Sequence, residues 1–355
     1  MHTSFGLTLV VNHACNLRCS YCYTGEKIRR PLPIQVGQKA IDRAIRSVQP
    51  QGTLELSFFG GEPLIEAELI LDLVQYAQVA AERHDVRLAL STTTNGTIES
   101  PAAWSVMTLP ELELAISHDG LPSVHDRKRV AVDGLPSSAR VQHTMTRLID
   151  AGQEFRVVMV VEPDNVDALP DGMEFLHSLG IRRFDPSLNL WTTWTQADGE
   201  HLKVAIRGAA DFWAERLPDC SVSWFDEKAA RASGVPITQT ARCGFGHGEI
   251  AVTPVGNLFP CERLVGADEP DSPMRLSGNV MEGDDFLAMT SLTPMHTSEC
   301  DPCHLKLLCS TKICRCSNFI RTGDVNRPDG LLCLLDQTCY QETVRVLESR
   351  FLSSN

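Results

Sequence analysis

The sequence predicts an α/β protein in which a partial (β/α)6 barrel of the TIM type precedes a smaller, cysteine-rich domain. Three observations predict it. Apolar strand patterns alternate with amphipathic helix patterns through residues 5–190, polar motifs follow successive strands, and the composition changes at Cys243. Six strand–helix units in a row imply a parallel sheet with right-handed crossovers. The 355 residues are enough for two domains.

The elements follow one another along the chain with the periodicity of strands and helices. The predicted strands are residues 5–11, 54–59, 86–91, 112–117, 156–161 and 184–190. The predicted helices between them are residues 35–48, 65–82, 138–151 and 165–179. In the second helix, one apolar face is formed by Ile65, Leu69, Ile70, Leu73, Val74 and Ala77. We therefore assign residues 1–194 to the barrel.

The C-terminal half has a different organisation. Residues 195–240 are expected to form a helix at 196–216 and a linker. Residues 241–345 are expected to form a second domain held by metal more than by a large core, because cysteine, glycine and proline become frequent there. A closing helix is predicted at 337–352, with residues 346–355 as its C-terminal tail.

Polar segments come directly after the first four predicted strands. They are the cysteines from Cys15, the segment Gly60–Pro63, Asn95, and the run from Ser117 to Gly120. In parallel barrels the loops after the strands meet on one rim and carry the chemistry. The sequence therefore predicts a single site on that rim.

Composition excludes several classes of protein. The net charge is −13, so a nucleic-acid partner is not expected, because phosphate binding needs concentrated Lys and Arg. No apolar run is long enough to cross a membrane, and the N-terminus lacks a signal-peptide pattern, so we expect a cytoplasmic protein. Thirteen cysteines in a reducing compartment indicate metal or catalytic sites instead of disulfides.

Three of the cysteines form one short motif, Cys15-x3-Cys19-x2-Cys22, and the next cysteine is Cys220. A [4Fe–4S] cluster usually takes four cysteine ligands, so three nearby thiolates would leave one iron free to bind a substrate or cofactor. The alternative is a structural zinc site completed by His13.

The segment from Cys15 to Cys22 resembles the C-x3-C-x-aromatic-C signature of the radical S-adenosylmethionine (SAM) superfamily. The resemblance implies that SAM chelates the open iron and is cleaved by the reduced cluster to a 5′-deoxyadenosyl radical, which abstracts hydrogen from a substrate. Tyr21 would lie near the adenine. A flavodoxin or ferredoxin-type reductant would supply the electron.

Further positions match the same family. Gly60, Gly61, Glu62 and Pro63 resemble its GGEP segment, which holds the SAM amino group. Glycines permit close backbone approach, and a carboxylate accepts hydrogen bonds from an ammonium. Asn95 and Ser117 resemble residues that approach the methionyl and ribose groups, and Val160 is expected to touch the adenine.

The C-terminal cysteines resemble the SPASM domain of radical SAM peptide-modifying enzymes. The resemblance implies two auxiliary Fe–S clusters, of the [4Fe–4S] type. The first would be held by Cys243, Cys261 and Cys314 or Cys316, or by all four. The second would be held by Cys300, Cys303, Cys309 and Cys333, with Cys339 as the alternative to Cys333. The sequence departs from the family pattern at Cys314-Arg315-Cys316. Zinc is the alternative metal for this domain.

The pairing of the two regions implies a maturase that acts on a ribosomally made precursor peptide. Auxiliary clusters suit oxidative reactions, so we expect an intrapeptide crosslink, with a carbon–carbon cyclophane favoured and a thioether next. The alternative enzyme is an anaerobic sulfatase-maturing enzyme that forms formylglycine, and a non-catalytic Fe–S electron-transfer protein is the alternative of another class. The leader peptide is expected to bind the barrel, the second domain or a separate protein, because Cys15 lies so near the start of the chain.

A base must accept a proton after hydrogen abstraction. Asp119 is the first candidate, because it lies beside Ser117 on the catalytic rim. The alternative role for Asp119 is to order the turn at His118-Asp119-Gly120. Asp126 and Glu249 are weaker candidates for the base.

Overall fold

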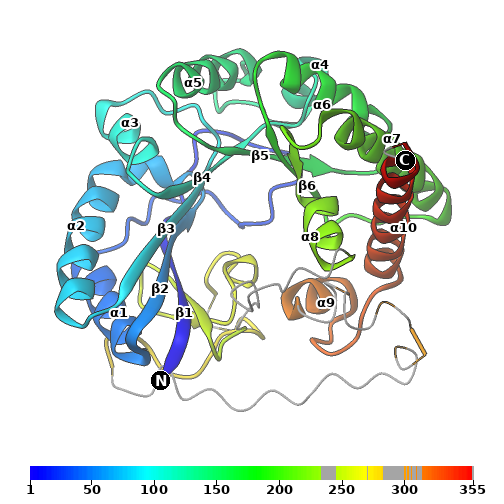
Figure 1. Ribbon diagram of the computed structural model, residues 1–355. Helices are drawn as coiled ribbons and strands as arrows, with labels where there is room; N and C mark the ends of the chain where they lie inside the picture. Colours follow the sequence, from blue (N-terminus) through cyan, green and yellow to red (C-terminus); the bar gives the residue numbers. More distant parts are fainter. Residues whose placement is uncertain are drawn as a thin grey trace.

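The computed structural model describes residues 1–232, 245–269, 271–282, 300, 302–303, 305, 309 and 314–353. In this part of the chain, one curved sheet contains all the strands, with helices around its outer side (Figure 1). The strands are β1 (His2–Asn12), β2 (Val48–Gly60), β3 (Arg87–Thr94), β4 (Leu112–Ser117), β5 (Arg156–Val161), β6 (Arg183–Leu188), β7 (Ser221–Val222), β8 (Glu249–Val252) and β9 (Leu258–Phe259).

The sheet has the order β7-β6-β5-β4-β3-β2-β1-β8-β9. Each neighbouring pair is parallel except β8 and β9, which are antiparallel. Parallel strands joined in chain order need crossover connections, and the helices supply them. This arrangement confirms the predicted α/β class and parallel sheet, and it brings the ends of β1–β6 to one rim.

The helices connect successive strands through most of the chain. They are α1 (Ile34–Ser47), α2 (Ala67–Arg83), α3 (Pro101–Met107), α4 (Pro122–Lys128), α5 (Ser138–Asp150), α6 (Leu169–Ser178), α7 (Gln196–Arg216), α8 (Ser223–Ala232), α9 (Arg315–Thr322) and α10 (Gly330–Ser353). Both α4 and α5 lie between β4 and β5, and α9 and α10 follow the last strand. Three 3₁₀ turns matter for the site or its neighbours: η1 (Pro63–Glu66), η2 (Val166–Ala168) and η4 (Glu262–Leu264).

Some elements differ from the prediction. The helix predicted at 65–82 is the turn η1 followed by α2, so Ile65 leaves the apolar face and is 39% exposed, while Ile70 and Leu73 are buried. A 3₁₀ turn has three residues per turn, so it shifts the side chains relative to an α-helix. The helices α3 and α4 were not predicted, because seven residues are too few to establish a helical period. Each nevertheless begins at a proline, which favours a first helical position.

The C-terminal segment packs onto the barrel. The strand β8 pairs with β1 through Gly6–Glu249 to Leu9–Val252, and the sheet therefore continues beyond residue 240. The helix α10 lies against α7 and α8, and its Leu332, Cys339 and Val346 join the main hydrophobic core. It begins earlier than predicted, at Gly330. The domain boundaries at 194, 240 and 345 stay predictions.

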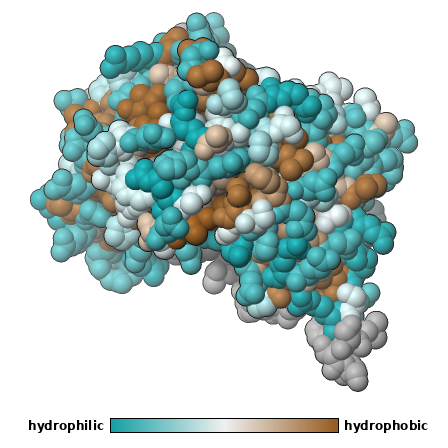
Figure 2. All heavy atoms as spheres, turned by 90° about the horizontal axis from the view of Figure 1, so that it is seen from above, coloured by the Kyte–Doolittle hydropathy of each residue, from teal (hydrophilic) through white to brown (hydrophobic). Residues whose placement is uncertain are grey.

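The surface seen in Figure 2 is largely hydrophilic, with apolar side chains gathered in several patches. In the described segments no helix combines the length and hydropathy needed to cross a bilayer.

Candidate active site

A cavity of about 570 Å³ occupies the inside of the curved sheet and reaches the carboxyl ends of its strands. Among its lining residues are many that the sequence predicts for the site: Cys15, Cys19, Tyr21, Cys22, Gly60, Gly61, Glu62, Asn95, Ser117 and Val160. Pro63 and Asp119 lie outside the lining. The fold thus gathers side chains that are far apart in the sequence around one space.

The three N-terminal cysteines lie on the loop that leaves β1. The backbone of this loop is fixed to the segment after α4, because Arg18 N donates to Val130 O at 2.7 Å and Leu17 forms a bridge with Ala131. Within the loop, Cys22 N donates to Cys19 O at 3.1 Å. The loop therefore presents its thiols to the cavity from a held backbone.

The three thiols differ in acidity. Burial raises the pKa of Cys15 to about 11 and also raises the pKa of Cys19. Burial acts in the same direction on Cys22, but hydrogen bonds from Lys27 and Thr24 prevail and lower the pKa of Cys22. Metal ligation requires thiolates, and burial disfavours the thiolate form of Cys15 and Cys19, so binding a cluster there would release protons. Three thiols from one loop beside an open cavity are a donor set that fits an Fe–S cluster with one free iron.

Gly60 and Gly61 at the end of β2 lie against the end of β1 and the start of the cysteine loop. Gly61 N donates to Asn12 O at 2.9 Å, and Glu62 N donates to Ala14 O at 2.9 Å. A Cβ atom on Gly61 would lie 2.3 Å from Ala14 O, which is too close for any side chain. Glycine is therefore needed here to let the two strand ends meet.

The Glu62 carboxylate is buried at the inner wall of the cavity. It accepts hydrogen bonds from Leu64 N at 3.0 Å, Thr94 Oγ1 at 2.7 Å and Asn95 N at 2.7 Å. Burial raises the pKa of Glu62 to about 6, although these three donors act in the opposite direction. The carboxylate is thus held in one orientation.

Asn95 turns its side chain toward the cysteine loop. Its Nδ2 donates to Asn16 Oδ1 at 2.9 Å and lies 3.8 Å from Cys15 Sγ. Its Oδ1 accepts from Thr97 N at 2.9 Å and Thr97 Oγ1 at 2.6 Å. The carboxyl ends of β1, β2 and β3 are therefore joined by polar contacts around Cys15.

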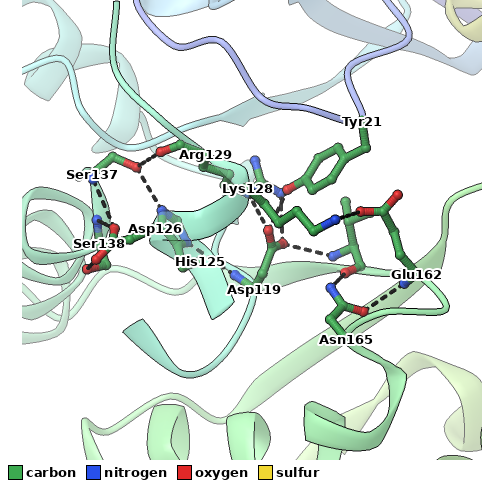
Figure 3. Close-up of polar contacts among 11 residues, drawn as sticks. Tyr21, Asp119, His125, Asp126, Lys128, Arg129, Ser137, Ser138, Glu162 and Asn165 are labelled. Carbon is green, nitrogen blue, oxygen red and sulfur yellow. Dashed lines mark hydrogen bonds and ion pairs between the residues drawn. The ribbon is translucent and has the colours of Figure 1, made fainter. Parts of the chain in front are cut away.

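Asp119, just after β4, is the hub of a polar network (Figure 3). Its carboxylate receives two hydrogen bonds from Arg129, at 3.0 Å from Nε and 3.1 Å from Nη2, and its side chain is 0% exposed. It also accepts from Tyr21 Oη at 2.5 Å and from Val160 N at 3.0 Å. Asp119 thus fixes two predicted SAM-contacting residues. Its role as the base stays a prediction.

The surroundings of this network keep the Arg129 guanidinium charged and the Tyr21 hydroxyl neutral. Burial opposes the charged form of Arg129, but the Asp119 carboxylate prevails and raises the pKa of the Arg129 guanidinium. Burial raises the pKa of the Tyr21 hydroxyl well above its ordinary value. Tyr21 is therefore a neutral donor toward Asp119. The guanidinium also lies 5.2 Å from the centre of the Tyr21 ring.

Outer contacts in Figure 3 hold Asp119 and its neighbours. His125 Nδ1 accepts from Asp119 N at 3.3 Å, and the other ring nitrogen contacts Ser137 Oγ at 2.9 Å. Asp126, the weaker candidate base, accepts from Ser137 N at 3.0 Å and from Ser138 N at 2.8 Å at the start of α5. Asp126 therefore anchors a helix. Glu249, the other weaker candidate, lines the cavity.

The structure also brings cysteines of the C-terminal region together in two groups. In the first, Cys314 Sγ lies 3.4 Å from Cys316 Sγ, and Cys261 packs against Cys316. In the second, burial raises the pKa of the Cys333 thiol to about 11, and the neighbouring Cys309, Cys300 and Cys303 thiols act in the same direction. Cys243 lies outside the described residues.

Two other cysteines lie elsewhere. Cys339 and Cys220 are buried in the main hydrophobic core, at 0% and 2% exposure. Both thiols are therefore core side chains. Among the described residues, no three His, Cys, Asp or Glu side chains are placed to hold a single metal ion. An Fe–S cluster differs from a single ion because its ligands are spread over several irons.

Several cavity residues were not predicted from the sequence. They are Arg129 after α4, Trp191 after β6, and Arg263 in η4. Trp191 could have been predicted as a site residue, because it directly follows the sixth predicted strand and the other predicted site residues lie in loops after strands. Arg129 lies beyond α4 and Arg263 lies in the C-terminal region, so only the folded chain brings them to the cavity.

Comparison with known proteins identifies the first region. Residues 9–176 match the family model described as the radical SAM superfamily. The sporulation killing factor maturation protein SkfB of Bacillus subtilis is 23% identical over 90% of this chain and 71% of its own length. The PqqA peptide cyclase of Granulibacter bethesdensis is 22% identical over 93% of this chain and 87% of its own length.

A third relative is the serine-type anaerobic sulfatase-maturating enzyme of Klebsiella aerogenes, 23% identical over 73% of this chain and 66% of its own length. The chain spans 59% to 71% of the length of the first relatives that it matches.

Two solved structures share the fold. The structure of anSMEcpe with bound AdoMet and the Kp18Cys peptide has a TM-score of 0.79 and 17% identity, covering 98% of this chain and 99% of its own. Streptococcus suis SuiB bound to the precursor peptide SuiA has a TM-score of 0.63 and 16% identity, covering 93% of this chain and 76% of its own.

Proposed function

Because residues 9–176 form a radical SAM domain, we propose that this chain is a radical SAM maturase that forms an oxidative crosslink within a ribosomally made precursor peptide. A carbon–carbon cyclophane is the favoured product and a thioether the next. The observation that carries the proposal is the meeting of two thiol-bearing regions at one cavity. Cys15, Cys19 and Cys22 line the cavity, and Glu262 and Arg263, which follow Cys261 directly, line it too.

In the proposed site, Cys15, Cys19 and Cys22 hold the cluster that binds SAM, and Tyr21, Gly60, Gly61, Glu62, Pro63, Asn95, Ser117 and Val160 surround the SAM. When bound, the cluster and SAM supply the radical that abstracts hydrogen. The chain's contribution is to fix the loop and the polar groups around it. Glu62, oriented by three donors, presents its carboxylate beside the cavity. Asp119 and Arg129 hold Tyr21 and the end of β5 in place.

The oxidation balances as follows. The peptide loses one hydrogen atom to the SAM-derived group, one proton to a base and one electron to an auxiliary Fe–S cluster, and one new bond forms between two of its residues. We assign the auxiliary ligands to Cys243, Cys261, Cys314 and Cys316 in one set and to Cys300, Cys303, Cys309 and Cys333 in the other. The neighbouring positions of Cys261, Cys314 and Cys316 support the first set. The core position of Cys339 supports Cys333 in the second.

The experiment is co-expression with a short open reading frame that adjoins the gene, followed by tandem mass spectrometry of the peptide. A crosslink without added atoms lowers the mass by two hydrogens, about 2 Da, and suppresses fragmentation between the joined residues. An unmodified peptide beside a sulfatase whose active-site Cys or Ser becomes an aldehyde would overturn the crosslink.

That second outcome defines the alternative function, anaerobic sulfatase maturation. It is favoured by the match to the Klebsiella aerogenes enzyme over 73% of this chain. Both functions require a polypeptide side chain to enter the cavity, and they differ in the partner that is modified.

A further inference from the structure

Trp191 stands out among the cavity residues because it is a large apolar side chain left 44% exposed. It lies three residues after the end of β6 at Leu188, on the rim where the cysteine loop also lies. Large aromatic side chains exposed within a cavity are common anchors for ligands.

The backbone on the N-terminal side of Trp191 is held by a chain of hydrogen bonds. Trp191 N donates to Asn189 Oδ1 at 2.9 Å, and Asn189 Nδ2 donates to the buried Glu162 Oε1 at 2.8 Å. The indole of Trp194 donates to Asn189 O at 3.1 Å. Asn189 therefore links the loop to the polar residues at the end of β5.

Arg321, on α9, holds the same loop from the other side. Its Nη1 donates to Leu190 O at 3.1 Å and to Thr192 O at 2.7 Å, the carbonyls on either side of Trp191. Because the backbone of this loop is already fixed, binding a ligand at Trp191 loses less conformational entropy than binding at a free loop would. The loop is thus preorganised around its tryptophan.

The indole also stacks on the cysteine loop. The ring centres of Trp191 and Tyr23 are 4.1 Å apart with an interplanar angle of 3°. Tyr23 follows Cys22 directly, and its ring lies 6.4 Å from that of Phe59 at an angle of 22°. Tyr23 covers one face of the indole, and Trp191 is also one of the residues that line the cavity.

We propose that the cavity face of Trp191 is the docking platform for an aromatic side chain of the precursor peptide. The inference deepens the proposed function, on which it rests, by naming the class of side chain received beside the cysteine loop. A flat indole stacks with another ring more favourably than with an aliphatic chain of equal area. The ring of Tyr23 already stacks on the other face of this indole. Cationic side chains also bind indoles, and tighter binding of a cation is the contrary outcome of the test below.

The test measures binding without turnover. The reconstituted holoenzyme with SAM is titrated with three capped pentapeptides, Ala-Ala-Xaa-Ala-Ala, in which Xaa is Phe, Leu or Lys, and each Kd is measured by saturation-transfer NMR. We expect the Phe peptide to bind about two- to tenfold more tightly than the Leu peptide. Trp191→Leu should abolish this preference, whereas Trp191→Phe should keep part of it.

Val204→Ala is the matched control, because Val204 is an apolar residue of α7 that is 71% exposed away from the cavity lining. It should leave the preference unchanged. Formation of 5′-deoxyadenosine without peptide verifies that each variant is loaded. The proposal is wrong if the preference for Phe persists in Trp191→Leu, or if the Lys peptide binds more tightly than the Phe peptide. The crosslink is judged from product mass and the platform from peptide affinity, so the two proposals fail separately.

Discussion

At the scale of single residues, the site depends on buried carboxylates held by several donors each. Asp119 contacts Tyr21, Arg129 and Val160, and Glu62 contacts groups from η1 and the end of β3. Buried charges are tolerated where they are paired and hydrogen-bonded. Such residues fix their neighbours, and removing one affects the whole group.

Replacing Asp119 by Asn separates positioning from base catalysis. If Asp119 positions Tyr21 and Arg129, Asp119→Asn should lower 5′-deoxyadenosine formation and peptide product together, by about tenfold or more, because small misplacements are costly. It should also destabilise the protein by about 3 kcal/mol, because Arg129 is left buried without its partner. The measurements are product analysis and urea unfolding.

The control for this variant is Asp164→Asn, because Asp164 pairs with Lys128 at 2.6 Å but its side chain is 55% exposed. Little change is expected there. A variant Asp119→Asn that forms 5′-deoxyadenosine at the normal rate but no crosslink would instead support the role of base.

Glu62 should give the folded protein a distinct pH dependence. Burial raises its pKa from 4.5 to about 6 in the folded state. The protonated form is therefore favoured by folding, so this contribution is fully present below pH 4.5 and is lost as the pH rises through about 6. Relative to Glu62→Gln, the SAM-free protein should lose about 2 kcal/mol of unfolding free energy over that range. If the unfolding free energies of the two proteins, measured in urea, change with pH in the same way over this range, the prediction is wrong.

At the scale of elements, the site depends on how closely the strand ends meet. β2 ends against the loop that follows β1, and the backbone contacts of Gly61 and Glu62 leave no space for a side chain at Gly61. The segment after α4 holds the same loop from the other side through Val130. The cysteine loop is thus clamped between two elements that are distant in sequence.

Gly61→Ala should therefore disturb the loop that carries the cysteines. The added Cβ would lie 2.3 Å from Ala14 O and 2.5 Å from His13 O, so the loop must move. Reconstituted protein should lose the iron of one cluster and most of its SAM cleavage, as measured by iron analysis and 5′-deoxyadenosine yield. Gly330→Ala is the control, because a Cβ there meets nothing within 4 Å. Full iron content and normal SAM cleavage in Gly61→Ala would show that the loop can accommodate the added Cβ atom, and the prediction would be wrong.

At the scale of the whole molecule, the C-terminal segment extends the sheet beyond β1. β8 pairs with β1, and α10 packs on α7 and α8, with α9 across the opening in Figure 1. The segment thereby brings Glu262 and Arg263 to the cavity that the N-terminal cysteines line. The two cysteine-rich regions, far apart in the chain, serve one site in the proposed function.

Removing the first cluster should leave the others in place. The variant with Cys15, Cys19 and Cys22 all replaced by Ala should form no 5′-deoxyadenosine after reduction with dithionite, yet keep iron and sulfide in the C-terminal region. The physical reason is that Cys261, Cys314 and Cys316 form a separate group. Unchanged cleavage would refute the SAM site, and loss of all iron, or zinc in its place, would remove the electron acceptor from the proposed reaction.

The sequence by itself determined the alternation of strands and helices, because the spacing of apolar residues within each segment favours a strand or a helix whatever the segment packs against. The bounds of β4, β5 and α7 coincide with those predicted. Motif spacing likewise determined the Cys15–Cys22 loop and the GGEP segment. Short elements such as α3 and α4 were missed, because their seven residues are fixed by packing and prolines more than by periodicity.

Only the tertiary structure decided which distant groups meet. The pairing of Asp119 with Arg129, the stacking of Tyr23 on Trp191, and the contacts of Arg321 with that loop all join separate elements. The addition of β8 to the β1 edge is of the same kind. Such contacts depend on the register and curvature of the sheet, which no local pattern encodes. The sequence thus determined the kind of chemistry, and the folding of the chain decided the shape and charge of the cavity.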